Sequence, residues 1–136
     1  MELNYKVQGG NFSNAGYASS QVKKVLKQLN IDSKLIKRIV VALYEAEVNI
    51  VAHAYSGDIK VDINAERIDI ILTDKGPGIP NIKKAMEIGY STASAEVREM
   101  GFGAGMGLNN IKNNTDTLNI KSKVNKGTIV HIANHF

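Results

Sequence analysis

The stretch Leu43-Tyr-Glu-Ala-Glu-Val-Asn-Ile-Val-Ala-His-Ala-Tyr55 decides the fold, because its pattern predicts the second half of a long, mostly apolar helix. Residues four apart on a helix share a face, so Glu45, Asn49 and His53 form one polar stripe. Glu47 points away from that stripe. Burying an amide without a partner costs roughly 2–7 kcal/mol, so the stripe needs partners. These are either backbone groups of a neighbouring loop, or a cation and a phosphate.

Two shorter elements precede this helix. Alternation of apolar and polar residues predicts an opening strand that contains Leu3, Tyr5 and Val7. Ser13 or Asn14 can then cap a first helix. That helix carries apolar residues at helical spacing, namely Val22, Val25, Leu26 and Leu29.

The long helix should begin at Ser33 with Asp32 as its cap, run to about Tyr55 and be stopped by Gly57. Alternating apolar residues on both sides of a turn over 64–67 then predict a hairpin: Ile59, Val61 and Ile63, followed by Ile68, Ile70 and Leu72.

The last third of the chain should contain a short helix capped by Asn81 and ended by Gly89, and then a mobile loop over 90–105. A further helix should start at Gly107 or Leu108. A second hairpin should turn at 125–127, between a strand with Leu118, Ile120 and Ser122 and a strand over 128–132. This order predicts one α+β domain over 1–136, a two-layer sandwich whose mixed, mostly antiparallel sheet carries helices on one face.

The composition is that of a globular protein, with 43% hydrophobic and 22% charged residues among 136. The absence of cysteine excludes disulfides and thiolate metal sites. No apolar run approaches a membrane span and no signal region opens the chain, so we expect a cytoplasmic protein without a membrane partner. The net charge of +4 is spread along the chain, and no aromatic residue lies beside a basic cluster, which argues against nucleic-acid binding.

Two glycine motifs accompany the polar stripe. The first is Asp74-Lys-Gly76-Pro-Gly78-Ile79, in which a carboxylate at the end of a strand is followed by glycines that permit close approach of backbone. The second, Gly101-Phe-Gly-Ala-Gly-Met-Gly-Leu108, leaves backbone amides unshielded before a helix, which favours phosphate. Taken alone, the second run is equally well explained as a flexible loop.

The three motifs together resemble those of the Bergerat-type (GHKL) ATPases, the superfamily of gyrase, the heat-shock chaperone, histidine kinases and the mismatch-repair ATPase. Glu45-x-x-x-Asn49 is similar to its N box, Asp74-x-Gly76-x-Gly78 to its first glycine box and Gly103-x-Gly105-x-Gly107-Leu108 to its second. Within that superfamily the chain most resembles the bacterial anti-sigma-factor serine kinases and switch-protein kinases. The stretches that carry this likeness are 45–55, 74–79, 89–92 and 125–128.

The resemblance implies a role for each matching residue. Asp74 would accept a hydrogen bond from the adenine amino group, with Thr128 helping through water. Asn49 would ligate magnesium, and Glu45 would act as general base. The remaining nucleotide-binding positions would be the two glycine boxes with a lid over 90–104, namely Gly76, Gly78, Ile79, Gly103, Gly105, Gly107 and Leu108.

The resemblance predicts an ATP- and Mg²⁺-dependent kinase that phosphorylates a serine of a small antagonist protein and regulates a sigma factor or similar partner. It also allows a homodimer. One departure matters, because Gly103 and Ala104 stand where related kinases carry a basic residue, and Arg98 is either its substitute or a solvated loop residue. Two other functions therefore stay open: an ATP-binding anti-sigma module without kinase activity, and an orphan catalytic domain of a histidine kinase.

Overall fold

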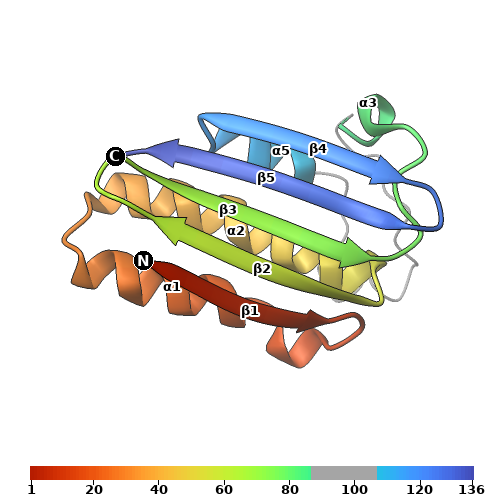
Figure 1. The fold of residues 1–136 in the computed structure, drawn as a ribbon, viewed down its shortest axis with the longest axis horizontal. Helices are drawn as coiled ribbons and strands as arrows, with labels where there is room; N and C mark the ends of the chain where they lie inside the picture. Colours follow the sequence, from red (N-terminus) through yellow and green to blue (C-terminus); the bar gives the residue numbers. More distant parts are fainter. Residues whose placement is uncertain (87–106) are drawn as a thin grey trace.

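The computed structural model of the chain describes residues 1–86 and 107–136. Its strands and helices, labelled in Figure 1, are in chain order β1 (Glu2–Gln8), the 3-10 helix η1 (Phe12–Asn14), α1 (Tyr17–Gln28), α2 (Ser33–His53), β2 (Ser56–Ile63), β3 (Arg67–Lys75), α3 (Ile82–Ala85), α5 (Gly107–Asn113), β4 (Thr117–Lys123) and β5 (Gly127–His135).

The described strands form one five-stranded sheet in the order β1-β2-β3-β5-β4. Every neighbouring pair in this order is antiparallel. The sequence predicted a mixed, mostly antiparallel sheet, but the described strands include no parallel pair. The predicted hairpins are confirmed as β2–β3 and β4–β5. Helices α1, α2 and α5 lie against one face of the sheet, as Figure 1 shows, which confirms the predicted two-layer α+β architecture.

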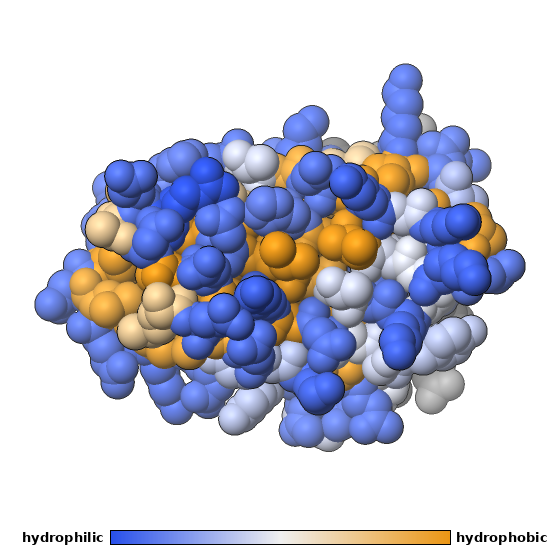
Figure 2. All heavy atoms as spheres, viewed as in Figure 1, coloured by the Kyte–Doolittle hydropathy of each residue, from blue (hydrophilic) through white to orange (hydrophobic). Residues whose placement is uncertain are grey.

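The core lies between the sheet and the helices, because the strands alternate buried and exposed residues. On the helix side, α2 contributes the fully buried Ile39 and Leu43, and β3 contributes Ile70 and Leu72. The other face of the sheet is open, and Figure 2 shows hydrophobic residues among the hydrophilic ones on it. Two large hydrophobic residues are exposed on this face, Ile71 of β3 and Ile129 of β5.

The first helix begins later than predicted. Ser13 and Asn14 belong to η1, and α1 is preceded by Gly16, whose φ of +92° is in the left-handed region. Neither predicted residue caps α1, because its first N–H groups are satisfied from a distant part of the chain. The carboxylate of Glu47 accepts hydrogen bonds from the backbone N–H groups of Ala18 and Ser19, each at 3.1 Å.

The long helix ends at His53, two residues before the predicted end, and Gly57 is not its stop signal. Ala54 is already extended, and the Tyr55 backbone N–H donates to the Lys75 carbonyl at 2.8 Å, so strand pairing ends the helix. Gly57 lies inside β2, where a Cβ would come within 2.9 Å of the Ile50 side chain. Its role is therefore close packing of β2 against α2.

Asn81 caps α3 as predicted, because its side-chain oxygen accepts from the Lys84 backbone N–H at 3.0 Å. That helix ends at Ala85. The predicted stop at Gly89 and the predicted loop over 90–105 lie outside the described residues. In the described part of the chain, no helix has the length and apolar character needed to cross a membrane.

Candidate nucleotide-binding site

The face of α2 that carries Glu45 and Asn49 contacts the start of α5. A Cβ at Gly107 would lie 3.3 Å from Asn49 Oδ1 and 3.4 Å from Glu45 Oε2. On the next turn of α5, Asn110 Nδ2 lies 3.4 Å from Glu45 Oε1. The last predicted glycine of the second box therefore touches both polar residues of the N box, although some 60 residues separate them in the sequence.

The absence of a side chain at Gly107 keeps space in front of the Asn49 oxygen. In the described part of the chain, the Asn49 side chain forms no hydrogen bond to another side chain or backbone group, and it is only half-buried. A carboxylate and an amide oxygen that face such a space match the oxygen donors that Mg²⁺ prefers. The residues present thus fit a magnesium ion that would take its remaining ligands from phosphate and water.

Glu47 is directed to the opposite side of α2, as its position in the sequence predicted. Its side chain is only 2% exposed and accepts three backbone hydrogen bonds at the start of α1, from Gly16 at 3.2 Å and from Ala18 and Ser19. A carboxylate is well suited to this place, because it compensates the unpaired N–H groups and the positive end of the helix dipole. Glu47 therefore holds α1 against the helix that carries the candidate site.

Asp74 lies near the end of β3, opposite Gly57 of β2. Its Oδ1 accepts a hydrogen bond from the Thr128 backbone N–H at 3.1 Å, which ties β3 to the start of β5. Burial raises the pKa of the Asp74 carboxyl above its ordinary value of 3.8, and the Thr128 hydrogen bond opposes that rise. Oδ2 has no such bond within the described residues, so it can accept one from a ligand.

Ser122 is a residue of this region to which the sequence analysis gave no role in the site. Its hydroxyl lies 2.8 Å from the Thr128 hydroxyl and accepts a hydrogen bond from the Ile79 backbone N–H at 2.7 Å. It thereby connects the first glycine box to Thr128. The sequence did contain a signal for this role. Ser122 is a polar residue in line with Leu118 and Ile120, on the face of β4 that alternation turns toward the helices.

The two glycines of the first box are both in tight contacts. A Cβ at Gly76 would lie 3.0 Å from Ala54 Cα and 3.4 Å from Asp74 Oδ1. Gly78 has a φ of +75°, and a Cβ there would collide with the backbone carbonyl of Lys123 at the β4–β5 turn. This hairpin is also held by the Asn125 backbone N–H, which donates to the Pro77 carbonyl at 2.9 Å.

We expect Gly78→Ala to destabilise the fold by about 1–3 kcal/mol more than Gly10→Ala, because a methyl group would collide with backbone only at position 78. Gly10 is a matched control, since its φ is +79° and nothing lies within 4 Å of its Cβ position. Urea unfolding of both variants measures the difference. Equal losses of stability would show that backbone conformation alone, and not the contact with Lys123, requires glycine.

The two halves of the candidate site lie along the same stretch of α2. Gly107 contacts it at Glu45 and Asn49, and Gly76 contacts its end at Ala54. Asn49 and His53, the last residue of α2, are separated by about 6 Å along the helix axis. Asp74 and Thr128, which a hydrogen bond joins, thus lie near the end of α2, and Asn49 lies about one turn earlier in the same helix.

The remaining predicted positions are only partly described. Leu108 packs against the core at the start of α5, and Ile79 contacts Ser122 as described above. His53 ends α2, and burial lowers the pKa of its imidazole. Gly103, Gly105, Ala104 and Arg98 lie outside the described residues.

The chain is similar to known proteins over most of its length. The family model described as "Histidine kinase-like ATPase domain" matches residues 13–133. The chain is 32% identical over 140 residues to a protein named anti-sigma F factor from Thermoanaerobacter sp. (strain X514), covering 99% of this chain and 92% of that protein. It is 34% identical over 110 residues to the serine/threonine-protein kinase RsbT of Bacillus subtilis (strain 168), covering 78% of this chain and 77% of that protein.

Among solved structures, the mycobacterial sensor histidine kinase MprB has the same fold. It superposes with a TM-score of 0.55 at 17% sequence identity, and the match covers 98% of this chain and 97% of that one. The motifs, the sheet with its layer of helices and the family match lead to one conclusion: the chain belongs to the histidine kinase-like ATPases.

Proposed function

We propose that this protein is an ATP-dependent serine kinase that phosphorylates a small antagonist protein in a partner-switching pathway. The observation that carries the proposal is the placement of Glu45 beside Asn49 and Gly107, with a carboxylate oxygen open to the same space as the amide oxygen. A carboxylate in that place can accept the proton of an attacking hydroxyl. The relatives named anti-sigma F factor and serine/threonine-protein kinase support this reading.

In the proposed reaction the serine hydroxyl oxygen forms a bond to the γ-phosphorus of ATP, and the bond from that phosphorus to the bridging oxygen breaks. ADP leaves with the electron pair, and the serine proton passes to Glu45. Asp74 holds the adenine amino group through its second oxygen, and Thr128 and Ser122 keep Asp74 and Ile79 in place. Asn49 would be the protein ligand of Mg²⁺, which neutralises phosphate charge when bound.

The arrangement of acidic groups supports a metal held jointly with the nucleotide. Among the described residues, no group of three His, Asp or Glu side chains could hold a metal ion unaided. Mg²⁺ usually keeps several waters and binds through few protein oxygens together with phosphates. We therefore expect magnesium affinity to be weak without nucleotide.

Transfer of labelled phosphate from ATP to candidate antagonist proteins tests the proposed activity. We expect an acid-stable phosphoserine on the antagonist. Acid-labile phosphate on a histidine would instead favour the histidine-kinase reading. ATP-dependent binding of a regulator without any transfer would favour the second candidate, a binding module, which the absence of a basic residue at Gly103 and Ala104 motivates.

Ionisation of the Asp74 carboxyl should change ATP affinity and the free energy of unfolding in opposite directions as the pH rises. Because burial raises its folded pKa above 3.8, Asp74 favours folding most below that value, and this contribution is lost as pH rises through the folded pKa. ATP affinity should do the reverse, since the ionised carboxylate is the stronger acceptor. Titrations of ATP and urea between about pH 4 and pH 7 measure both.

Asp74→Asn is the control for this pH dependence, because its amide keeps the shape of the side chain and does not titrate. We expect it to lower ATP affinity at neutral pH by about tenfold or more, since an amide N–H₂ would then face the adenine amino group. Its pH profiles should be flatter than those of the native protein. Identical profiles for the two proteins would exclude Asp74 as the titrating group.

A further inference from the structure

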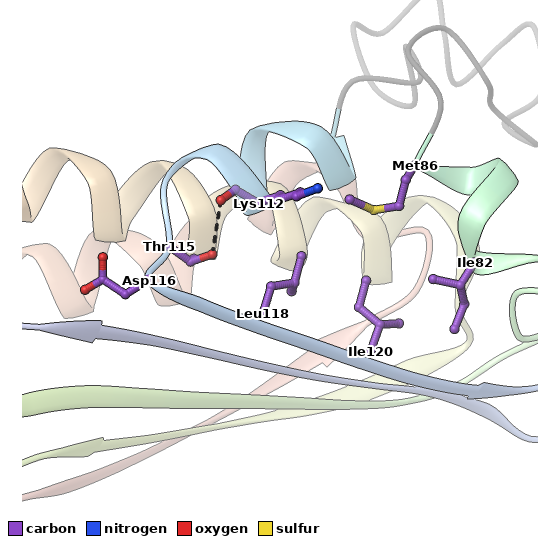
Figure 3. A pocket seen from close by; sticks show the side chains of 7 residues that line it. All are labelled: Ile82, Met86, Lys112, Thr115, Asp116, Leu118 and Ile120. Carbon is purple, nitrogen blue, oxygen red and sulfur yellow. Dashed lines mark hydrogen bonds between the residues drawn. The ribbon is translucent and has the colours of Figure 1, made fainter.

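A hollow whose lining residues differ from those of the candidate nucleotide site lies between α3, α5 and the inner side of β4. It has a volume of about 480 Å³ and is shown in Figure 3. Leu118 and Ile120 of β4 point toward α5, and Ile82 and Met86 approach from α3. The rim is completed by Lys112, Thr115 and Asp116. None of these seven residues contributes to the site proposed for ATP.

The strand that forms the floor of this hollow is an edge strand. β4 pairs with β5 only, at the end of the sheet order. Alternate residues of an antiparallel edge strand turn their N–H and C=O groups outward, where another strand can bind them. In residues 1–86 and 107–136, no backbone hydrogen bond joins Thr117–Lys121 to any element other than β5. The hollow and a free strand edge are thus adjacent.

The charge around this edge is positive. Lys112 of α5 lines the hollow, and Lys121 and Lys123 are exposed on β4 itself. Lys83 is exposed on α3, next in the chain to the lining residue Ile82. Within the described residues, none of the four forms an ion pair.

The acidic residue of the rim does not balance these lysines, because it is already paired. Asp116 lies 3.5 Å from Arg38 and accepts a hydrogen bond from the His135 backbone N–H at 2.8 Å. At the opposite edge of the sheet the charges are matched, since Lys6 of β1 pairs with Asp58 and Glu2 with Lys60. Of the two edges of the described sheet, the β4 edge is therefore the one with uncompensated positive charge.

The alternation of β4 defines the ligand that would fit. Leu118 and Ile120 face the hollow, while Lys121 and Lys123 lie on the other face of the sheet. Side chains of an added strand interact with the residues directly opposite on the same face. An added strand would thus place apolar residues into the hollow and acidic residues opposite the lysines.

We propose that the β4 edge is a docking site for an extended segment of another protein in which apolar and acidic residues alternate. The segment adds to the sheet as a further strand beside Thr117–Lys121, with its end next to Lys123. Main-chain hydrogen bonds supply part of the affinity, and the hollow and the lysines select the sequence. This inference concerns a separate surface and does not rest on kinase activity.

The test uses the full chain and a seven-residue peptide of alternating leucine and glutamate as the probe. We expect saturable binding that weakens with added salt, and slower amide hydrogen exchange at the outward N–H groups of Thr117–Lys121. Lys121→Glu combined with Lys123→Glu should weaken binding by about tenfold or more, because two attractive pairs become repulsive. These lysines are exposed, so the fold should be retained, as circular dichroism can check.

The matched control is Lys23→Glu combined with Lys24→Glu, which makes the same change of net charge at exposed positions of α1. It should leave the affinity within about twofold of the native value. Equal weakening by both pairs of substitutions would overturn the proposal, as would equal binding of a peptide of alternating leucine and lysine. Slower amide hydrogen exchange at β1 instead of β4 would also contradict it. Peptide binding that leaves the exchange of the β4 amides unchanged would contradict it as well.

Discussion

Glu45→Gln should lower the rate of phosphate transfer to the antagonist serine by about 10²–10⁴-fold while leaving ATP affinity nearly unchanged. The amide keeps the size of the side chain, and its oxygen can still face Asn110, so the fold should persist. It cannot accept the proton of the attacking hydroxyl. Single-turnover transfer from labelled ATP measures the chemical step, and a nucleotide titration measures affinity.

Glu66→Gln is the control, because Glu66 is exposed in the β2–β3 turn and its backbone N–H, not its carboxylate, forms the hydrogen bond to Asn64. It should transfer phosphate at the native rate. A Glu45→Gln variant as active as this control would remove Glu45 from the role of general base. A variant that loses ATP affinity as strongly as rate would show that Glu45 serves binding and not proton transfer.

Glu47→Ala should reduce the free energy of unfolding by about 3–5 kcal/mol, although Glu47 lies two residues from the proposed base. Its removal leaves the buried N–H groups of Ala18 and Ser19, and that of Gly16, without their acceptor. Glu47→Gln should cost less, because the amide oxygen can accept part of this hydrogen bonding. Urea unfolding followed by circular dichroism measures both losses.

Glu45→Ala provides a matched comparison, since it makes the same substitution in the same helix with the same change in helix propensity. Glu45 is only half-buried and its described hydrogen bond is a long one of 3.4 Å, so we expect a stability loss below about 1 kcal/mol. The two substitutions should thus separate stability from catalysis. Similar unfolding free energies for both would contradict the role given to Glu47.

The elements with strong local patterns were predictable from the sequence. Alternation marked both hairpins, because each strand of the sheet buries one face against the helices. The long helix and the start of α5 at Gly107 followed from apolar spacing and from glycine. The order of the three motifs also led to the correct family.

What the sequence did not reveal depends on contacts between distant residues. The start of α1 is set by a carboxylate 28–31 residues further along the chain, which no local capping rule contains. The end of α2 is set by the hydrogen bond of Tyr55 to Lys75. Ser122 joins Ile79 to Thr128 only because the β4–β5 hairpin packs against the first glycine box.

The most direct test is a crystal structure of the protein with a non-hydrolysable ATP analogue and Mg²⁺. We predict that the adenine amino group donates to Asp74 Oδ2, that the metal is bound by Asn49 Oδ1 and that the phosphates lie beside Gly107. A nucleotide bound elsewhere, or a metal without Asn49 among its ligands, would contradict this account of the site.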